Sequence, residues 1–98
     1  MSRLIWSVEA VDDLEAIVAF IGRDSAVRAS FVARRIIGCA ERLAEFPELG
    51  AVILESPDHR YRHLLYSPFR IIYRVSDETV YLVAVIHGAR DWSPPQTN

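Results

Sequence analysis

The chain has 98 residues, 51% of them hydrophobic and 24% charged, so it can bury the core of one domain and is too apolar to be disordered. Thirteen acidic residues and eleven basic ones, all arginine, give a net charge of −2 and a pI near 5.9. The chain therefore lacks the overall positive field of most nucleic-acid-binding proteins. If it binds nucleic acid, it must do so through a local basic patch.

The first half of the sequence predicts a short strand and two helices. Residues 3–8 form the strand, and residues 9–21 carry apolar side chains at steps of three and four, as an amphipathic helix does. Ser25 is a suitable N-cap for a second helix over residues 26–46, which ends at Pro47. Because about three residues join these helices, they must lie antiparallel as a hairpin.

The second half changes to a period of two and predicts three strands, over residues 60–66, 69–75 and 79–87. The short connections between them force an antiparallel meander. The last strand is apolar on both faces and so should lie inside the sheet. The expected fold is α+β: a strand, a helical hairpin and a three-stranded meander in a single domain over residues 1–92, with a polar C-terminal tail over residues 93–98.

Nothing in the sequence indicates export, a membrane or a metal. The longest apolar run has seven residues, far short of the roughly 20 that a spanning helix needs, and we expect no signal peptide. Cys39 is the only cysteine, so it forms no internal disulfide or cysteine cluster. His59, His63 and His87 match no zinc spacing. We expect a cytoplasmic protein without metal or cofactor.

The order of these segments resembles the RelE/ParE superfamily of toxins from type II toxin–antitoxin systems, and the resemblance covers nearly the whole chain. The motifs that carry it are Trp6 followed by Asp-Asp-Leu-Glu-Ala-Ile at 12–17, Pro-Glu-Leu-Gly at 47–50, Arg-His-Leu at 62–64, Phe-Arg-Ile-Ile-Tyr-Arg-Val at 69–75 and His-Gly-Ala-Arg-Asp at 87–91. The resemblance implies the fold described above. It also implies an antitoxin whose C-terminal segment wraps the toxin and neutralises it.

The superfamily has two kinds of target, and the ParE-like kind is the preferred interpretation. ParE-like members poison DNA gyrase by binding it, without chemistry of their own. On this hypothesis the chain is not an enzyme and forms a hetero-oligomer with a ParD-like antitoxin. The candidate contacts with the target are Arg62, His87, Arg90 and Trp92.

The alternative is a RelE-like endonuclease that cuts messenger RNA in the ribosome. Such cleavage needs a base, an acid and cations around the phosphate. The residues available for it are His87 with Arg62, Arg70 and Arg74, the three arginines being expected to line one face of the sheet. The chain has no lysine in this region, although many RelE-like members do, and its net acidity suits an RNA target poorly. Ordinary alternation of outward polar residues also explains Arg70 and Arg74.

The antitoxin should cover apolar side chains that the toxin alone leaves exposed. The candidates for that surface are Trp6, Leu49, Val52, Ile53 and Leu54.

Overall fold

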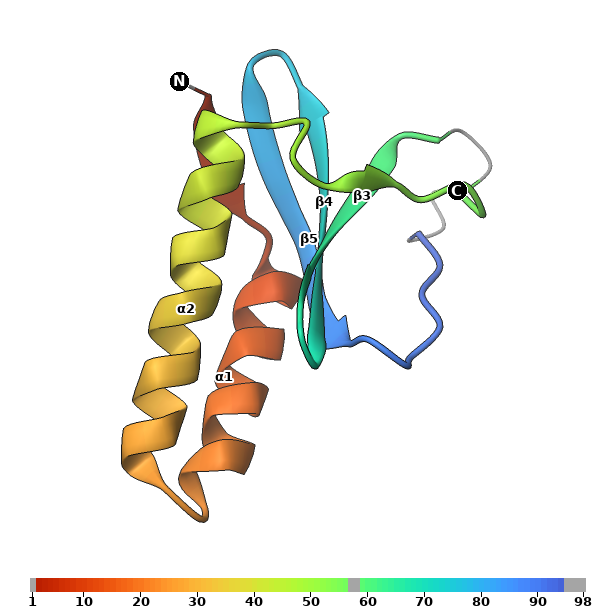
Figure 1. Cartoon of the computed structure of the whole chain (residues 1–98). Helices are drawn as coiled ribbons and strands as arrows, with labels where there is room; N and C mark the ends of the chain where they lie inside the picture. Colours follow the sequence, from red (N-terminus) through yellow and green to blue (C-terminus); the bar gives the residue numbers. More distant parts are fainter. Residues whose placement is uncertain (1, 57–58, 95–98) are drawn as a thin grey trace.

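The computed structural model describes residues 2–56 and 59–94 as one α+β domain in which a helical hairpin lies against a five-stranded sheet (Figure 1). Pro57, Asp58 and most of the expected polar tail fall outside the described residues. The elements, in chain order, are β1 (Arg3–Trp6), α1 (Val8–Gly22), α2 (Ala26–Glu45), β2 (Ala51–Val52), β3 (Tyr61–Tyr66), β4 (Phe69–Ser76) and β5 (Thr79–His87). The expected fold class is confirmed, with small shifts at the ends of the elements.

The sheet has the order β1-β5-β4-β3-β2, and β3, β4 and β5 form the expected antiparallel meander. β5 lies inside the sheet, as its apolar sequence predicts, because β1 pairs with it in parallel. At the other edge, Ala51 and Val52 pair antiparallel with β3 and form a short strand where the sequence predicts a loop. Two residues are too few to show an alternating pattern, so periodicity could not reveal this strand.

Side-chain hydrogen bonds start both helices and fix the first one on the sheet. Ser7 Oγ accepts the Ala10 N–H at 3.0 Å and donates to the Val83 carbonyl at 3.2 Å. Asp13 Oδ2 accepts the Val85 N–H at 2.9 Å, which ties the middle of α1 to β5. Ser25 caps α2 as predicted, since its Oγ accepts the Arg28 N–H at 3.1 Å.

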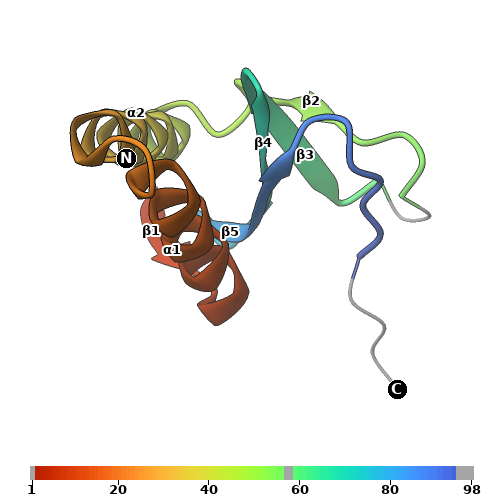
Figure 2. The same cartoon turned by 90° about the horizontal axis from the view of Figure 1, so that it is seen from below.

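The sheet buries apolar residues on both faces. The main core lies between the hairpin and one face, where α2 contributes Ile36, Ala40 and Leu43. We call the opposite face the distal face; in Figure 2 the C-terminal segment runs along it, on the side away from the helices. A smaller cluster on the distal face contains Ile53, Ile72, Ala84 and Ile86, with Tyr61, Val83 and Trp92 packed against it.

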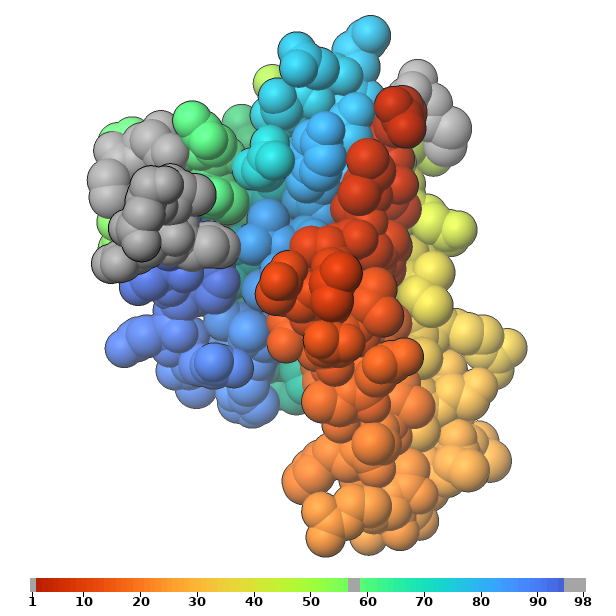
Figure 3. Space-filling model, turned by 180° about the vertical axis from the view of Figure 1, so that it is seen from behind, coloured from red at the N-terminus to blue at the C-terminus, as the bar shows by residue number. Residues whose placement is uncertain are grey.

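The hairpin is longer than its contact with the sheet, so its connecting turn projects beyond the ends of the strands (Figures 1 and 3). Within the described residues, neither helix is long and apolar enough to cross a membrane.

Candidate functional site

The register of β3 and β4 separates the arginines that the sequence groups together. Residues directly opposite each other in an antiparallel pair point to the same face. Arg62 lies opposite Tyr73 and therefore on the helix side of the sheet. Arg70 and Arg74 alternate with Tyr73 along β4 and lie on the distal face. The expectation that all three arginines line one face is therefore wrong.

Arg62 binds the turn that follows α2. Its guanidinium donates to the carbonyl of Gly50 at 2.7 Å and lies 3.5 Å from the carbonyl of Glu48. Tyr73 supports the same turn from within the core, because its hydroxyl donates to the Pro47 carbonyl at 2.7 Å and accepts the Gly50 N–H at 2.9 Å. We name residues 47–50 the Pro-Gly turn. Both side chains hold this turn against the sheet, which gives Arg62 a structural role.

The other two arginines have different surroundings on the distal face. The guanidinium of Arg74 stacks on the ring of Tyr81, 4.2 Å from its centroid. Arg70 Nε is buried and has no hydrogen-bond partner. A buried donor without a partner is costly, so it marks a place where a further acceptor could bind.

His63 shares the distal face with Arg70, and the sequence did not single it out as a target-binding or catalytic residue. It lies opposite Ile72, and its Nδ1 is also buried without a hydrogen-bond partner. Burial lowers the pKa of His63, the charge of Arg70 lowers it further, and Glu55 acts in the opposite direction. The alternation along residues 61–66 gives the period of the strand but not its register with β4. For that reason the sequence could not assign His63 to the distal face.

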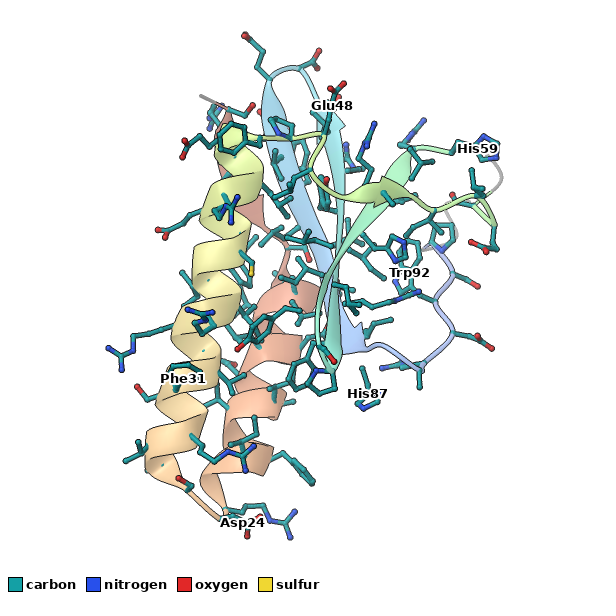
Figure 4. The ribbon with its side chains drawn as sticks, viewed as in Figure 1. Asp24, Phe31, Glu48, His59, His87 and Trp92 are labelled. Atoms are coloured by element: carbon teal, nitrogen blue, oxygen red, sulfur yellow. The ribbon has the colours of Figure 1, made fainter. Side chains whose placement is uncertain are left out.

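The C-terminal segment folds back over the distal face. The ring of Trp92 meets that of Tyr61 edge to face, with 5.0 Å between the centroids (Figure 4). Beside Trp92 is a cavity of about 420 Å³, lined by Ile53, Glu55, Arg70, Gly88, Ala89, Arg90, Asp91, Trp92 and Ser93. Arg70 therefore lines the same cavity as two other candidate residues, Arg90 and Trp92, although it is distant from them in sequence.

His87 does not line this cavity. It stands exposed at the end of β5, and its Nδ1 accepts the Ala89 N–H at 3.2 Å. His87 lies opposite Phe69, whose ring it faces edge-on at 6.4 Å. The residues expected for RNA cleavage are thus spread over both faces and the end of the sheet. The described residues include no group of histidines, cysteines or carboxylates that could hold a metal.

The residues expected to meet an antitoxin divide into exposed and buried ones. Leu54 and Leu49 are exposed, at 71% and 43%, and Val52 is half-buried. Trp6 packs against the main core, because its pairing with Leu82 turns it toward the helices. Ile53 is only 6% exposed and belongs to the distal cluster. The prediction of an exposed side chain is therefore wrong for Ile53, whereas Trp6 is half-buried.

Leu49 opens onto a groove on the helix side of the sheet. This groove has a volume of about 710 Å³ and lies between the end of α2, the Pro-Gly turn and β3–β4. Its lining combines exposed apolar side chains with both charge signs: Glu45, Phe46, Pro47, Glu48, Leu49, Arg60, Arg62 and Val75. Such a groove can accept an apolar side chain of a partner and hold polar groups at its rim.

Comparison with known proteins defines the class of this domain. Residues 4–92 match the family described as ParE toxin of the type II toxin–antitoxin system parDE. A curated relative, Toxin RelE2 of Caulobacter vibrioides, is 35% identical over 91 residues, which are 92% of this chain and 99% of the relative. The domain is the toxin component of a type II toxin–antitoxin system. More specifically, the chain belongs to the ParE toxin family.

Two solved structures have the same fold. A chain of the chromosomal ParDE system from P. aeruginosa superposes with a TM-score of 0.74 at 23% identity, covering 89% of this chain and 96% of its own. The isolated RelE toxin of E. coli gives a TM-score of 0.63 at 18% identity, covering 93% of this chain and 88% of its own. The relatives thus carry both superfamily names, so the target must be inferred from the site itself.

Proposed function

We propose that this toxin arrests growth by binding DNA gyrase in the cytoplasm, without catalysing a reaction, and that a ParD-like antitoxin neutralises it. The observation that carries the proposal is the separation of the candidate catalytic residues. Arg62 lies on the helix side of the sheet, whereas Arg70 and Arg74 lie on the distal face. A ribonuclease site needs its cations and its acid–base groups around one phosphate.

The individual contacts support the same conclusion. The guanidinium of Arg62 is bound to carbonyls of the Pro-Gly turn, and that of Arg74 is stacked on Tyr81. The exposed His87 accepts a hydrogen bond from its own turn and is not among the residues that line the cavity of Arg70. This set of residues is better suited to hold the fold and to present a surface than to cleave RNA.

The proposed contacts with gyrase are His87 and Arg90, which lie exposed in the segment that leaves β5. Trp92 anchors this segment through its contact with Tyr61. An exposed segment held at one end can present polar side chains with little loss of entropy on binding. Arg62 is less suited to this role, because its guanidinium already binds the Pro-Gly turn.

A supercoiling assay tests the proposal. The antitoxin-free chain is added to gyrase and relaxed plasmid, and separately to translating ribosomes with labelled messenger RNA. We expect inhibition of supercoiling and intact RNA. Arg90→Ala should weaken the inhibition, while Arg28→Ala, an exposed arginine of α2, serves as the matched control. Cleavage of ribosome-bound RNA with gyrase unaffected would refute the proposal.

A second candidate function rests on the cavity at the distal face. Arg70 and Arg90 both line it, and the buried Arg70 Nε and His63 Nδ1 lack hydrogen-bond partners. Two guanidinium groups in one cavity can hold a phosphate. This arrangement favours a RelE-like messenger ribonuclease that uses Arg70 and Arg90 in place of Arg62 and Arg74. Ribosome-dependent cleavage that Arg70→Ala abolishes would support it, and intact RNA with the unaltered chain would exclude it.

A further inference from the structure

The side of the helical hairpin that faces away from the sheet carries exposed apolar side chains. We call this side the outer hairpin face. Val8 on α1 is 71% exposed, and Val27 and Phe31 on α2 are 81% and 53% exposed. Phe31 lies on the outer side of α2 in Figure 4, and Figure 3 shows α1 and α2 side by side in one surface. An apolar face of this kind on a small domain marks an interaction site.

The charges of the two helices have opposite signs. α1 contains four acidic residues and no basic one: Glu9, Asp12, Asp13 and Glu15. α2 contains two glutamates near its end, Glu41 and Glu45, and four arginines, three of them in its first half: Arg28, Arg34, Arg35 and Arg42. In the described part of the chain, no ion pair engages Asp12, Glu15 or Arg34. The guanidinium of Arg35 lies 5.6 Å from the centre of the Phe31 ring.

The direction of each helix sets where these charges lie along the hairpin. α1 begins beside the sheet, so its acidic residues lie at the base of the hairpin (Figure 1). α2 begins at the connecting turn, so Arg28 lies near the tip, and Arg34 and Arg35 lie halfway along the helix. The apolar residues follow the same division, because Val8 lies at the base while Val27 and Phe31 lie near the tip.

We propose that the chain self-associates as a symmetric dimer through the outer hairpin face, with the two hairpins antiparallel. A two-fold axis across the hairpins places the tip of each copy on the base of the other. Phe31 and Val27 then pack on Val8 of the partner copy, and Arg34 and Arg35 meet the acidic residues of the partner's first helix. Arginine suits these contacts, because its planar fork binds carboxylates in a bidentate manner.

A second copy fits this face better than a partner of one charge sign. An acidic partner would match the tip of the hairpin and be repelled by its base, and a basic partner would do the reverse. Only a surface with both signs in reversed order satisfies the whole face, and the chain itself carries such a surface.

Analytical ultracentrifugation of the antitoxin-free chain tests this proposal. We expect a concentration-dependent monomer–dimer equilibrium that high salt weakens, because exposed ion pairs are screened. Phe31→Asp should abolish the dimer while circular dichroism shows an unchanged fold. Leu54→Asp, at an exposed apolar residue outside the hairpin, is the matched control and should leave the dimer intact.

Charge reversal provides a sharper test. The pair Arg34→Glu and Arg35→Glu should make one variant monomeric, and Asp12→Arg with Glu15→Arg should make another monomeric. Mixing the two variants should restore a heterodimer, because both contacts between the first and second helices then join opposite charges. A chain that stays monomeric at all concentrations, or a dimer that Phe31→Asp leaves intact, would overturn the proposal. If the chain is monomeric and Phe31→Asp instead weakens antitoxin binding, the face belongs to the antitoxin and the dimer is wrong.

Discussion

Tyr73 shows how one side chain positions a whole turn. Its buried hydroxyl binds both the Pro47 carbonyl and the Gly50 N–H. We predict that Tyr73→Phe lowers the free energy of unfolding by about 1–3 kcal/mol, because it leaves the buried Gly50 N–H without an acceptor. Urea denaturation measures the change. Tyr81→Phe is the control and should cost less than about 0.5 kcal/mol, because it keeps the ring under Arg74. Equal costs for both variants would argue against this role.

His63 gives the stability of the fold a pH dependence. Burial and the charge of Arg70 lower the pKa of His63 in the folded chain. The unfolded chain therefore takes up its proton first, at a pH near 6.5. It follows that stability falls as the pH drops below about 6.5, and that the loss is complete below the folded pKa. We predict that His63→Gln reduces this loss between about pH 7.5 and about pH 5.

Denaturation curves at several pH values measure this effect. His87→Gln is the matched control, because His87 is exposed at the end of β5. It should keep the pH dependence of the unaltered chain. If the His63→Gln variant shows the same pH dependence as the unaltered chain, a group other than His63 causes the loss of stability.

The sequence identified candidate residues for the site, but it could not predict on which face of the sheet each of them lies. The alternation along 69–75 correctly assigned Arg70 and Arg74 to one face, because the period of a strand is local. The face of Arg62 depends on which residue of β4 it meets, and a shift of one residue reverses that face. The pattern also could not show that Arg70 and Arg90 line one cavity, because this depends on the fold of the C-terminal segment.

At the scale of elements, Gly38 is a point of weakness in α2. A β-carbon at this position would meet nothing within 4 Å. Glycine in a helix costs on the order of 1 kcal/mol relative to alanine. We predict that Gly38→Ala raises the free energy of unfolding by about 0.5–1 kcal/mol, as measured by chemical denaturation. Gly50→Ala is the contrasting variant and should destabilise, because its β-carbon would lie 2.7 Å from the His63 carbonyl oxygen. A loss of stability in Gly38→Ala would contradict this account.

The helices and the meander could be predicted because each has its own signal. Ser25 and Pro47 mark the ends of α2, and the connections at 67–68 and 77–78 are too short for anything but hairpins. The parallel pairing of β1 with β5 has no such signal, because the two strands are more than seventy residues apart. The pairing was found only in the structure, where Leu4 and Trp6 lie beside Val80 and Leu82.

At the scale of the whole molecule, the toxin has three separate surfaces that a partner can reach. The groove beside the Pro-Gly turn combines apolar and charged side chains, the distal face carries the C-terminal segment, and the outer hairpin face carries charges of both signs. A domain of this size has little stability to spare, so a partner that covers an apolar surface should stabilise it markedly. The three surfaces are distinct, so one partner could bind without displacing another.

We predict that the cognate antitoxin raises the melting temperature of the toxin by on the order of 10 °C at saturation. A ligand present at about one hundred times its Kd contributes about 2.7 kcal/mol to the folded state. For a domain of this size, each kcal/mol shifts the melting temperature by about 4–8 °C. Differential scanning fluorimetry over an antitoxin titration measures the shift. Leu49→Asp, in the groove beside the Pro-Gly turn, should reduce the shift at equal antitoxin concentration.

The control for this experiment is Leu65→Asp, which changes an exposed leucine outside that groove. The shift is measured from the melting temperature of this variant without antitoxin. It should equal the shift of the unaltered chain. The comparison separates loss of binding from loss of stability, because each variant is measured with and without antitoxin. An unchanged melting temperature of the unaltered toxin at saturating antitoxin would show that no exposed apolar surface is covered. Equal shifts in both variants would instead place the antitoxin away from Leu49.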